Sequence, residues 1–160
     1  MFASFQKMAT SRFKFGWFML AKLPSAFICG VRVSALNPQE AIVSVPFTWL
    51  SQNPFNSTYF ACLSMAAEMS TGLLALGHLH KRQSAVSMLV TKVNGTFVKK
   101  ATERIYFTCA DGDAILLAIE TAVTTGEGQV VSVTSNGRTA AGDVVAIFTI
   151  EWSFKARVKK

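Results

Sequence analysis

The chain has few charged residues, and one long stretch contains almost none. Only 16% of the 160 residues are Asp, Glu, Lys or Arg, and Glu68 is the single charged residue between Glu40 and Lys81. A carboxylate that is buried without a partner is costly or takes up a proton. Glu68 therefore needs either a structural partner or a chemical role.

Cysteine and histidine are also scarce. The three cysteines, Cys29, Cys62 and Cys109, form no CxxC motif and cannot all pair, which favours a reduced, cytoplasmic setting. His78 and His80 have no neighbouring cluster of further ligands, so we expect no metal site. No phosphate-loop pattern is present, and we expect no cofactor.

The apolar segments do not form a convincing membrane span or signal peptide. Residues 53–76 are long enough to raise the question, because a span needs about 20 apolar residues. They begin with Asn, Ser and Thr, however, and carry Glu68 at their centre, where a charge is expensive in lipid. Arg12, Lys14 and Lys22 interrupt the N-terminal apolar residues, which argues against a signal peptide.

The net charge of +7 makes the chain basic. Basic surfaces attract polyanions such as nucleic acid, acidic membranes, phosphorylated cofactors and acidic carrier proteins, although charge also serves solubility. Here the basic residues are scattered without an aromatic-interleaved motif, so we expect no nucleic-acid partner.

The apolar periodicity predicts an α+β fold in one domain, residues 1–160, that begins with an amphipathic helix. In that helix Phe13, Trp17 and Leu20 recur at helical spacing. Three short segments that contain glycine predict breaks in the strands. Asn94-Gly95 predicts a bulge, whereas Asn136-Gly137 and residues 141–143 predict hairpin turns. The predicted helices are 1–23, 58–76 and 114–125, and the predicted strands are 31–36, 41–49, 85–98, 102–109, 129–134 and 143–152.

The helix predicted at 58–76 is the organising element of the fold. Pro54 blocks a helix upstream, residues 56–58 are N-cap types, and Gly77 is a plausible stop. The helix is hydrophobic nearly all round, so it must be nearly enclosed. An antiparallel sheet must in turn have one of its faces covered. A sheet that curves around this helix encloses the helix and covers that face of the sheet.

This architecture resembles the hotdog fold, and the residues before the helix extend the resemblance. Hotdog proteins of the phenylacetyl-CoA thioesterase type carry an Asn, a His-Gly-Gly and then an acidic residue on the helix. In this chain Asn53 precedes Glu68 by fifteen residues, while Tyr59, Phe60 and Ala61 stand at the His-Gly-Gly positions.

Residues 15–155 are more closely similar to a hotdog family described as thioesterase-like and of unknown function, which carries Asn, Tyr-Phe and Ala-Glu in this order. Related hotdog dehydratases place a His before the acidic helix, and no His precedes Glu68 here. Dehydration is therefore disfavoured.

The resemblance implies hydrolysis of an acyl thioester carried by coenzyme A or an acyl carrier protein. Glu68 would act as general base or as nucleophile, and Asn53 would orient the water or the carboxylate. The backbone N–H groups of Phe60 and Ala61 would stabilise the oxyanion. The other predicted site residues are Tyr59, Phe55, Ser64 and Thr71 in the substrate pocket and Lys99, Lys100 and Arg82 at the coenzyme A phosphates.

Several alternatives remain open. Side chains at Phe60 and Ala61, in place of two glycines, obstruct a close approach, which keeps a non-catalytic acyl-CoA or fatty-acyl binding protein as the alternative function. Glu68 has a structural alternative, a salt bridge to a partner subunit or to an arginine such as Arg104. Asn53, next to Pro54, is also a typical turn residue.

An open sheet leaves an edge strand that needs protection. The resemblance implies that paired protomers form one continuous sheet, with the acyl-CoA sites between subunits. We therefore expect a homodimer or homotetramer.

Overall fold

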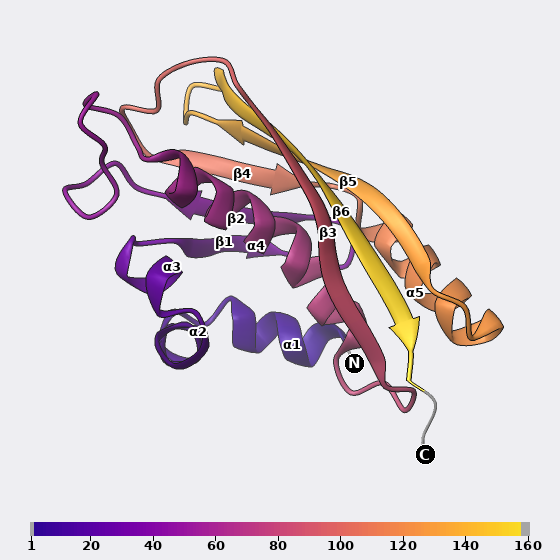
Figure 1. Ribbon diagram of the computed structural model, residues 1–160. Coiled ribbons are helices and arrows are strands. Elements are labelled where there is room, and N and C mark those ends of the chain that lie inside the picture. The colour runs from indigo at the N-terminus through magenta and orange to yellow at the C-terminus, as the bar shows by residue number, and fades with distance from the viewer. Residues whose placement is uncertain (1, 158–160) are drawn as a thin grey trace.

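A curved antiparallel sheet surrounds one long helix, α4 (Phe60–Leu79), in the computed structural model of the chain (Figure 1). The structure describes residues 2–157. Within them the sheet order is β1-β2-β4-β5-β6-β3, and all paired strands are antiparallel. The strands are β1 (Arg32–Leu36), β2 (Ala41–Val45), β3 (Val86–Phe97), β4 (Ile105–Cys109), β5 (Gln129–Arg138) and β6 (Val144–Ala156). The predicted α+β class, with a sheet curved around a central helix, is confirmed.

Four further helices cover the parts of α4 and the sheet that would otherwise face water. Three of them, α1 (Phe2–Ala9), α2 (Arg12–Lys22) and α3 (Pro24–Ile28), gather along the β1 edge, whereas α5 (Gly112–Thr125) packs against β5 and β6 (Figure 1).

The buried surface of α4 is apolar apart from a few hydroxyl groups, and these are hydrogen-bonded. The Ser70 and Ser135 hydroxyls lie 2.8 Å apart, and the Trp152 indole N–H donates to Thr71 Oγ1 at 2.9 Å. Such pairing is what buried polar groups require. By length and composition α4 also passes as a membrane span, but 67% of its most apolar window is buried inside the fold. Enclosure by the sheet therefore accounts for its apolarity, and the absence of a span stays a prediction.

The ends of α4 differ from the predicted 58–76. Tyr59 is the N-cap, and its side chain forms no capping hydrogen bond. Thr58, which has a cap-type side chain, does not cap the helix because its N–H and hydroxyl donate to the Ala101 carbonyl at 2.7 and 3.2 Å. Gly77 does not stop the helix. It is buried inside α4, and a Cβ there would collide with the Phe2 ring of α1. This glycine serves helix packing, which overrides its local tendency to end a helix.

The single N-terminal helix predicted for residues 1–23 is two helices. The chain breaks after Ala9, and the Ser11 side chain caps α2 by accepting from the Lys14 N–H at 3.5 Å. Pro24 then opens α3 at its first turn, a position that proline favours.

The face that α2 buries is also not the predicted one. Phe15 and Met19 enter the core, whereas Phe13 and Trp17 are 76% and 61% exposed. Because Phe residues occupy both sides of this helix, its periodicity alone could not decide which side faces the core.

Two of the three glycine signals in the sheet mark close packing, and the features predicted for them, a bulge at 94–95 and a turn at 136–137, are not found there. The β3 bulge lies between Val90 and Lys92 and not at 94–95. Residues 136–137 are paired strand residues, with Gly137 opposite Phe107 of β4 and Ala146 of β6. The turn predicted at 141–143 is present, and Gly142 has a φ of +94° there. The two misread glycines make room for aromatic rings of the core.

Replacement of Gly137 by alanine should destabilise the fold by roughly 1–3 kcal/mol, the range for overpacking a core. A Cβ at this position would lie 2.5 Å from the Phe107 ring, and that ring is fully buried and cannot swing away. Urea unfolding measures the loss. The matched control is Gly128→Ala, where a Cβ meets nothing within 4 Å, and equal stabilities of the two variants would contradict the packing argument.

Candidate functional site

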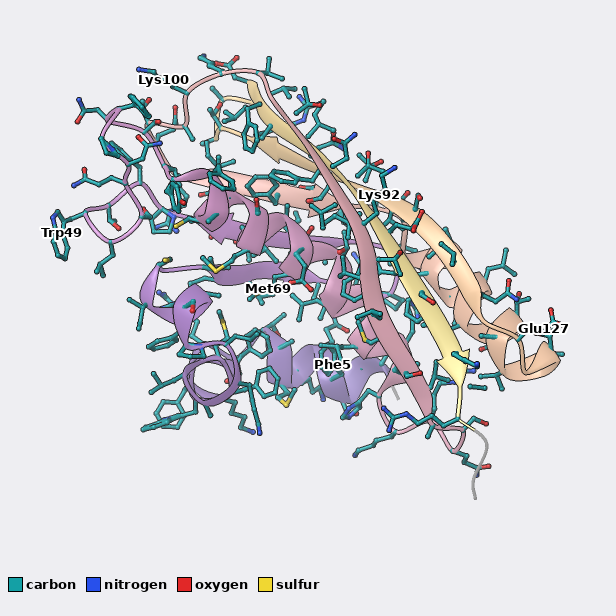
Figure 2. All side chains as sticks on the ribbon, in the orientation of Figure 1. Phe5, Trp49, Met69, Lys92, Lys100 and Glu127 are labelled. Carbon is teal, nitrogen blue, oxygen red and sulfur yellow. The ribbon has the colours of Figure 1, made fainter. Side chains whose placement is uncertain are left out.

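A pocket of about 600 Å³ opens at the start of α4, between the loop that precedes the helix and the end of β3. Trp49 and Lys100 mark this end of the molecule in Figure 2, and Glu127 marks the opposite end. Six of the predicted site residues line the pocket: Asn53, Phe55, Tyr59, Phe60, Lys99 and Lys100. Leu63 and Phe97 complete an apolar wall. The pocket is thus of a size and polarity that suit an acyl group.

The first turn of α4 presents backbone donors at this pocket. The N–H groups of Cys62 and Leu63 both bind the Tyr59 carbonyl, at 2.9 and 3.3 Å. The N–H groups of Phe60 and Ala61 precede them and have no carbonyl partner within the helix. They add to the positive end of the helix dipole, which is the arrangement that stabilises an oxyanion. Phe60 lines the pocket, whereas Ala61 is not among its lining residues.

Two aromatic rings line the pocket at the start of α4, and one of them, Phe60, stands at the first glycine position of the His-Gly-Gly pattern. The Tyr59 and Phe60 ring centroids are 4.8 Å apart, and Phe60 in turn meets Phe97 edge to face at 6.5 Å. This contact gives Phe60 a defined place beside the end of β3. The helix N–H group of Phe60 thus lies beside aromatic side chains that line the pocket.

Asn53 holds the loop before the helix. Its Oδ1 accepts from the Phe55 N–H at 2.9 Å and from both the N–H and the hydroxyl of Ser57, at 3.3 and 3.2 Å. An Asn that bonds to backbone N–H groups two and four residues later stabilises a turn. The side-chain carbonyl is therefore occupied, and Asn53 can offer a reacting group only its amide N–H₂.

The three predicted phosphate contacts do not converge. Lys99 pairs with Asp143 at 2.7 Å, and Lys100 donates to the Phe55 carbonyl at 3.3 Å. Arg82 follows the far end of α4, where it pairs with Glu120 at 2.7 Å. Arg82 therefore lies away from the pocket that Lys99 and Lys100 line, and its contact with a phosphate group stays a prediction. No group of three His, Cys, Asp or Glu side chains that could hold a metal ion occurs in residues 2–157.

Glu68 lies in a second pocket, of about 210 Å³, halfway along α4. Apart from Lys22, its neighbours there are apolar, and they include Phe15 of α2, Met88 of β3 and Trp152 of β6. Burial raises the pKa of the Glu68 carboxyl above its ordinary value. A Cβ at Gly72 would come within 3.3 Å of Glu68 Oε1, so the missing side chain makes room for the carboxyl group.

The Glu68 carboxyl group has no ion pair or hydrogen bond within residues 2–157. Arg104, one partner proposed for a salt bridge, instead donates to the Ser44 hydroxyl at 3.4 Å, and the other proposed salt bridge, to a partner subunit, stays a prediction. Lys22 lines the same pocket as Glu68 but forms no ion pair with it among the described residues. An unpaired carboxyl with a raised pKa in an accessible apolar pocket has the properties of a general base.

The helix keeps these two groups of predicted site residues apart. Phe60 and Glu68 are separated by eight helical residues, roughly 12 Å along the axis. Between them, Ser64 donates its hydroxyl to the Phe60 carbonyl at 2.9 Å. Thr71 is fully buried and bonded to Trp152, so it lines no pocket and the prediction of a substrate contact there is not supported. Within one chain, Glu68 cannot reach a carbonyl group held by the helix start.

Sequence reasoning missed the residues that distant strands bring to the two pockets. Phe97, Val98 and Ala101 reach the helix start from β3 and the segment after it, and Met88 and Trp152 reach Glu68. The β3–β6 register, with Val90 opposite Trp152 and Met88 opposite Phe154, brings Met88 and Trp152 to one face of the sheet, and no local sequence signal shows this register.

Comparisons with known proteins place this geometry in a fold family. The sequence profile of the family described as a domain of unknown function, DUF4442, matches residues 11–154. PA5026 from Pseudomonas aeruginosa, described as a protein of unknown function and probable thioesterase, is 21% identical. Its structure gives a TM-score of 0.74 over 87% of this chain and 93% of that one.

Two further solved structures are similar over most of their length. Thioesterase HI1161 from Haemophilus influenzae has a TM-score of 0.65 at 11% identity, covering 93% of each chain. A protein of unknown function from Chlorobaculum tepidum has a TM-score of 0.75 at 13% identity, covering 93% of this chain and 99% of that one. No curated protein sequence matches this chain. The chain has the hotdog fold of these thioesterase-like proteins.

The raised pKa of Glu68 predicts a pH-dependent difference between the wild type and Glu68→Gln. A carboxyl whose pKa is higher in the folded than in the unfolded state binds protons more tightly when folded. Native stability therefore falls as pH rises from the ordinary pKa to the raised one, and the loss is complete above it. At pH 8 the Gln variant should match or exceed the wild type in urea unfolding, and its advantage should vanish at acidic pH.

Glu127→Gln is the matched control for this comparison, because Glu127 is exposed on the turn after α5. It should show no such trend. A Glu68→Gln variant that is less stable than the wild type at pH 8 would contradict the expectation and would indicate a cation that pairs with Glu68.

Proposed function

The chain belongs to the DUF4442 family, described as a domain of unknown function, and we propose that it hydrolyses acyl thioesters of coenzyme A or of an acyl carrier protein. The observation that carries this proposal is the apolar pocket at the first turn of α4, which Phe60 lines and where the N–H groups of Phe60 and Ala61 begin the helix. The description of HI1161 as a thioesterase and of PA5026 as a probable one supports it.

The proposed chemistry divides between the two pockets. The acyl carbonyl oxygen accepts hydrogen bonds from the Phe60 and Ala61 N–H groups, which stabilise the negative charge that develops there. Glu68 takes a proton from a water molecule as the water oxygen bonds to the carbonyl carbon. When the carbon–sulfur bond breaks, that proton passes to the leaving sulfur, and the products are a carboxylic acid and a free thiol.

A second copy of the chain is needed to bring the two pockets together. Strand β3 is an edge of the sheet, and its exposed side chains include Leu89, Val93 and Phe97, which are 65%, 51% and 49% exposed. A long apolar edge strand pairs readily with another strand. We therefore propose that two copies join through β3 to form a continuous sheet.

The positions of the pockets along β3 favour this assembly. Met88 lines the Glu68 pocket and Phe97 lines the helix-start pocket. A two-fold axis near the middle of β3 would pair two β3 strands in antiparallel fashion, and it would bring the Met88 half of the partner's strand beside the Phe97 half of the first. The partner subunit's Glu68 pocket would then adjoin the helix start of the first chain.

A non-catalytic acyl-binding protein is the second candidate. The specific observation in its favour is the aromatic contact of Phe60 with Tyr59 and Phe97 at the pocket mouth, which narrows the approach to the helix N–H groups. Binding of an acyl-CoA without turnover would favour this function.

A panel of acyl-CoAs assayed with a thiol-reactive dye tests the function, and two substitutions assign the roles. Glu68→Gln removes the base, and turnover should fall by roughly 10²–10⁴. Phe60→Pro removes one helix N–H and should lower turnover by roughly 10²–10³. Proline fits the first position of a helix, and Tyr59 before it already has the extended φ of −63° and ψ of 136° that proline requires.

Phe60→Ala is the control for the second substitution, because it removes the ring but keeps the N–H group. It should change substrate affinity more than turnover number. Hydrolysis that is undiminished in both Glu68→Gln and Phe60→Pro would exclude the proposed mechanism.

Mixed dimers test the sharing of the site between two chains. We expect both Glu68→Gln and Phe60→Pro to be inactive by themselves, yet to recover about a quarter of wild-type turnover when mixed and refolded together. In a symmetric dimer half of the pairs are then mixed, and each mixed pair has one intact site out of two. Light scattering confirms the dimers. Mixed dimers without recovered activity, or a stable monomer, would contradict a shared site.

A further inference from the structure

A third pocket, of about 290 Å³, lies away from both of these sites, between α2 and strands β1, β2 and β4. Three arginines line it: Arg12 from the first turn of α2, Arg32 from β1 and Arg104 from the residue before β4. Nothing in the proposed hydrolysis uses them. The pocket is the place in the described chain where guanidinium groups from three separate segments converge.

Strand pairing brings two of these arginines and two hydroxyl groups to one face of the sheet. Arg32 lies opposite Ser44, and Ser44 lies opposite Tyr106. Directly opposed residues of neighbouring strands share a face, and so do Arg104 and Tyr106, which are two residues apart. Arg104 also donates to the Ser44 hydroxyl at 3.4 Å. Arg12 then closes this group from the side of α2.

Arg32 is held in place without being neutralised. Its Nη1 donates to the carbonyl groups of Phe27 and Val31, at 3.1 and 2.7 Å. Its guanidinium carbon lies 4.6 Å from the centroid of the Phe27 ring. Burial, and the nearby charges of Arg12 and Arg104, lower the pKa of Arg32, but a guanidinium remains protonated in proteins. The pocket therefore contains three fixed positive charges.

Within the described part of the chain, no carboxylate forms an ion pair with these arginines. The ion pairs within residues 2–157 are Arg82 with Glu120 and Lys99 with Asp143, and neither involves a pocket arginine. Three like charges that face one cavity without a counter-ion repel one another, and an anion in the cavity would relieve this repulsion.

We propose that this pocket binds the phosphate group of a phosphate ester. The planar donor forks of arginine match phosphate oxygens in pairs, and three positive charges suit a dianion better than a singly charged carboxylate. The volume of about 290 Å³ equals roughly ten water molecules at about 30 Å³ each. This is more than a bare phosphate ion needs, so the ester's organic group also enters the pocket.

The surroundings add an apolar side to this site. A groove of about 210 Å³, lined by Phe13, Trp17 and Phe27 among others, shares Arg12 and Gly16 with the arginine pocket. Two phosphate esters therefore fit the arrangement by chemistry: the phosphate of a nucleotide-containing coenzyme, or that of a phospholipid headgroup. The shared element is the phosphate group held by the arginines.

The test measures binding of three probes to the full chain at 150 mM salt: sn-glycerol 3-phosphate and coenzyme A by calorimetry, and phosphatidylglycerol vesicles by sedimentation. The variants are Arg12→Gln and Arg104→Gln, since both residues are exposed enough to be replaced without loss of the fold, and thermal unfolding checks this. Each variant should weaken binding by about tenfold or more, because a hydrogen bond to a charged group is lost.

Arg157→Gln is the matched control, since it removes the same charge from an exposed residue outside the pocket and should leave affinity unchanged. Arginine-dependent binding of any probe supports the site. A response confined to coenzyme A assigns it to a coenzyme phosphate, and one confined to vesicles assigns it to a headgroup. Equal affinities of the wild type and both pocket variants for all three probes would overturn the proposal. Because the readout is binding, the result is independent of thioester hydrolysis.

Discussion

Enclosure of α4 is the constraint on which the rest of the structure depends. This helix is apolar on nearly every side, so no single layer can cover it. The curved sheet covers one side, and α1 closes the C-terminal end by packing Phe2 against Gly77. The remaining polar groups on the buried surface are hydrogen-bonded, as in the pair of Ser70 and Ser135 hydroxyls. A helix shielded in this way can carry one ionisable residue in an apolar setting, and Glu68 is that residue.

The same enclosure determines where chemistry can take place. The cover is incomplete at the start of α4, where the N–H groups of the first turn meet the large pocket, and at mid-helix, where Glu68 meets a small one. Both openings lie beside β3, which is also the strand with the exposed apolar edge. The proposed assembly and the proposed catalysis are therefore linked, because the exposed apolar edge strand borders both halves of the proposed site.

The sequence predicted the features that depend on local or compositional signals. Glu68 was identifiable because no other charge lies near it in the chain, and the central helix and the sheet followed from apolar periodicity. The failures occurred where tertiary packing overrides a local signal. Asn136-Gly137 has the composition of a hairpin turn, yet it lies within β5 because the Phe107 ring occupies the space beside Gly137.

The missed parts of the sites have a common physical cause. Arg12, Arg32 and Arg104 belong to three distant segments, and only the register that places Arg32 opposite Ser44 and Ser44 opposite Tyr106 brings them together. One residue of slippage in that register would turn these side chains to the other face. Strand registers of this kind depend on the whole core, and residue types alone do not determine them.

The distribution of charge fits the chemistry of the proposed ligands. The one carboxyl group in an apolar pocket lies at mid-helix, whereas cations with no acidic partner gather at the β1 edge and Lys100 stands beside the helix start. A thioester of a phosphorylated carrier has an apolar tail and a polyanionic head. Apolar pockets beside cations complement such a molecule at both ends, and the net charge of +7 would attract it from solution. The basic character of the chain is then a property of its binding surfaces as well as of its solubility.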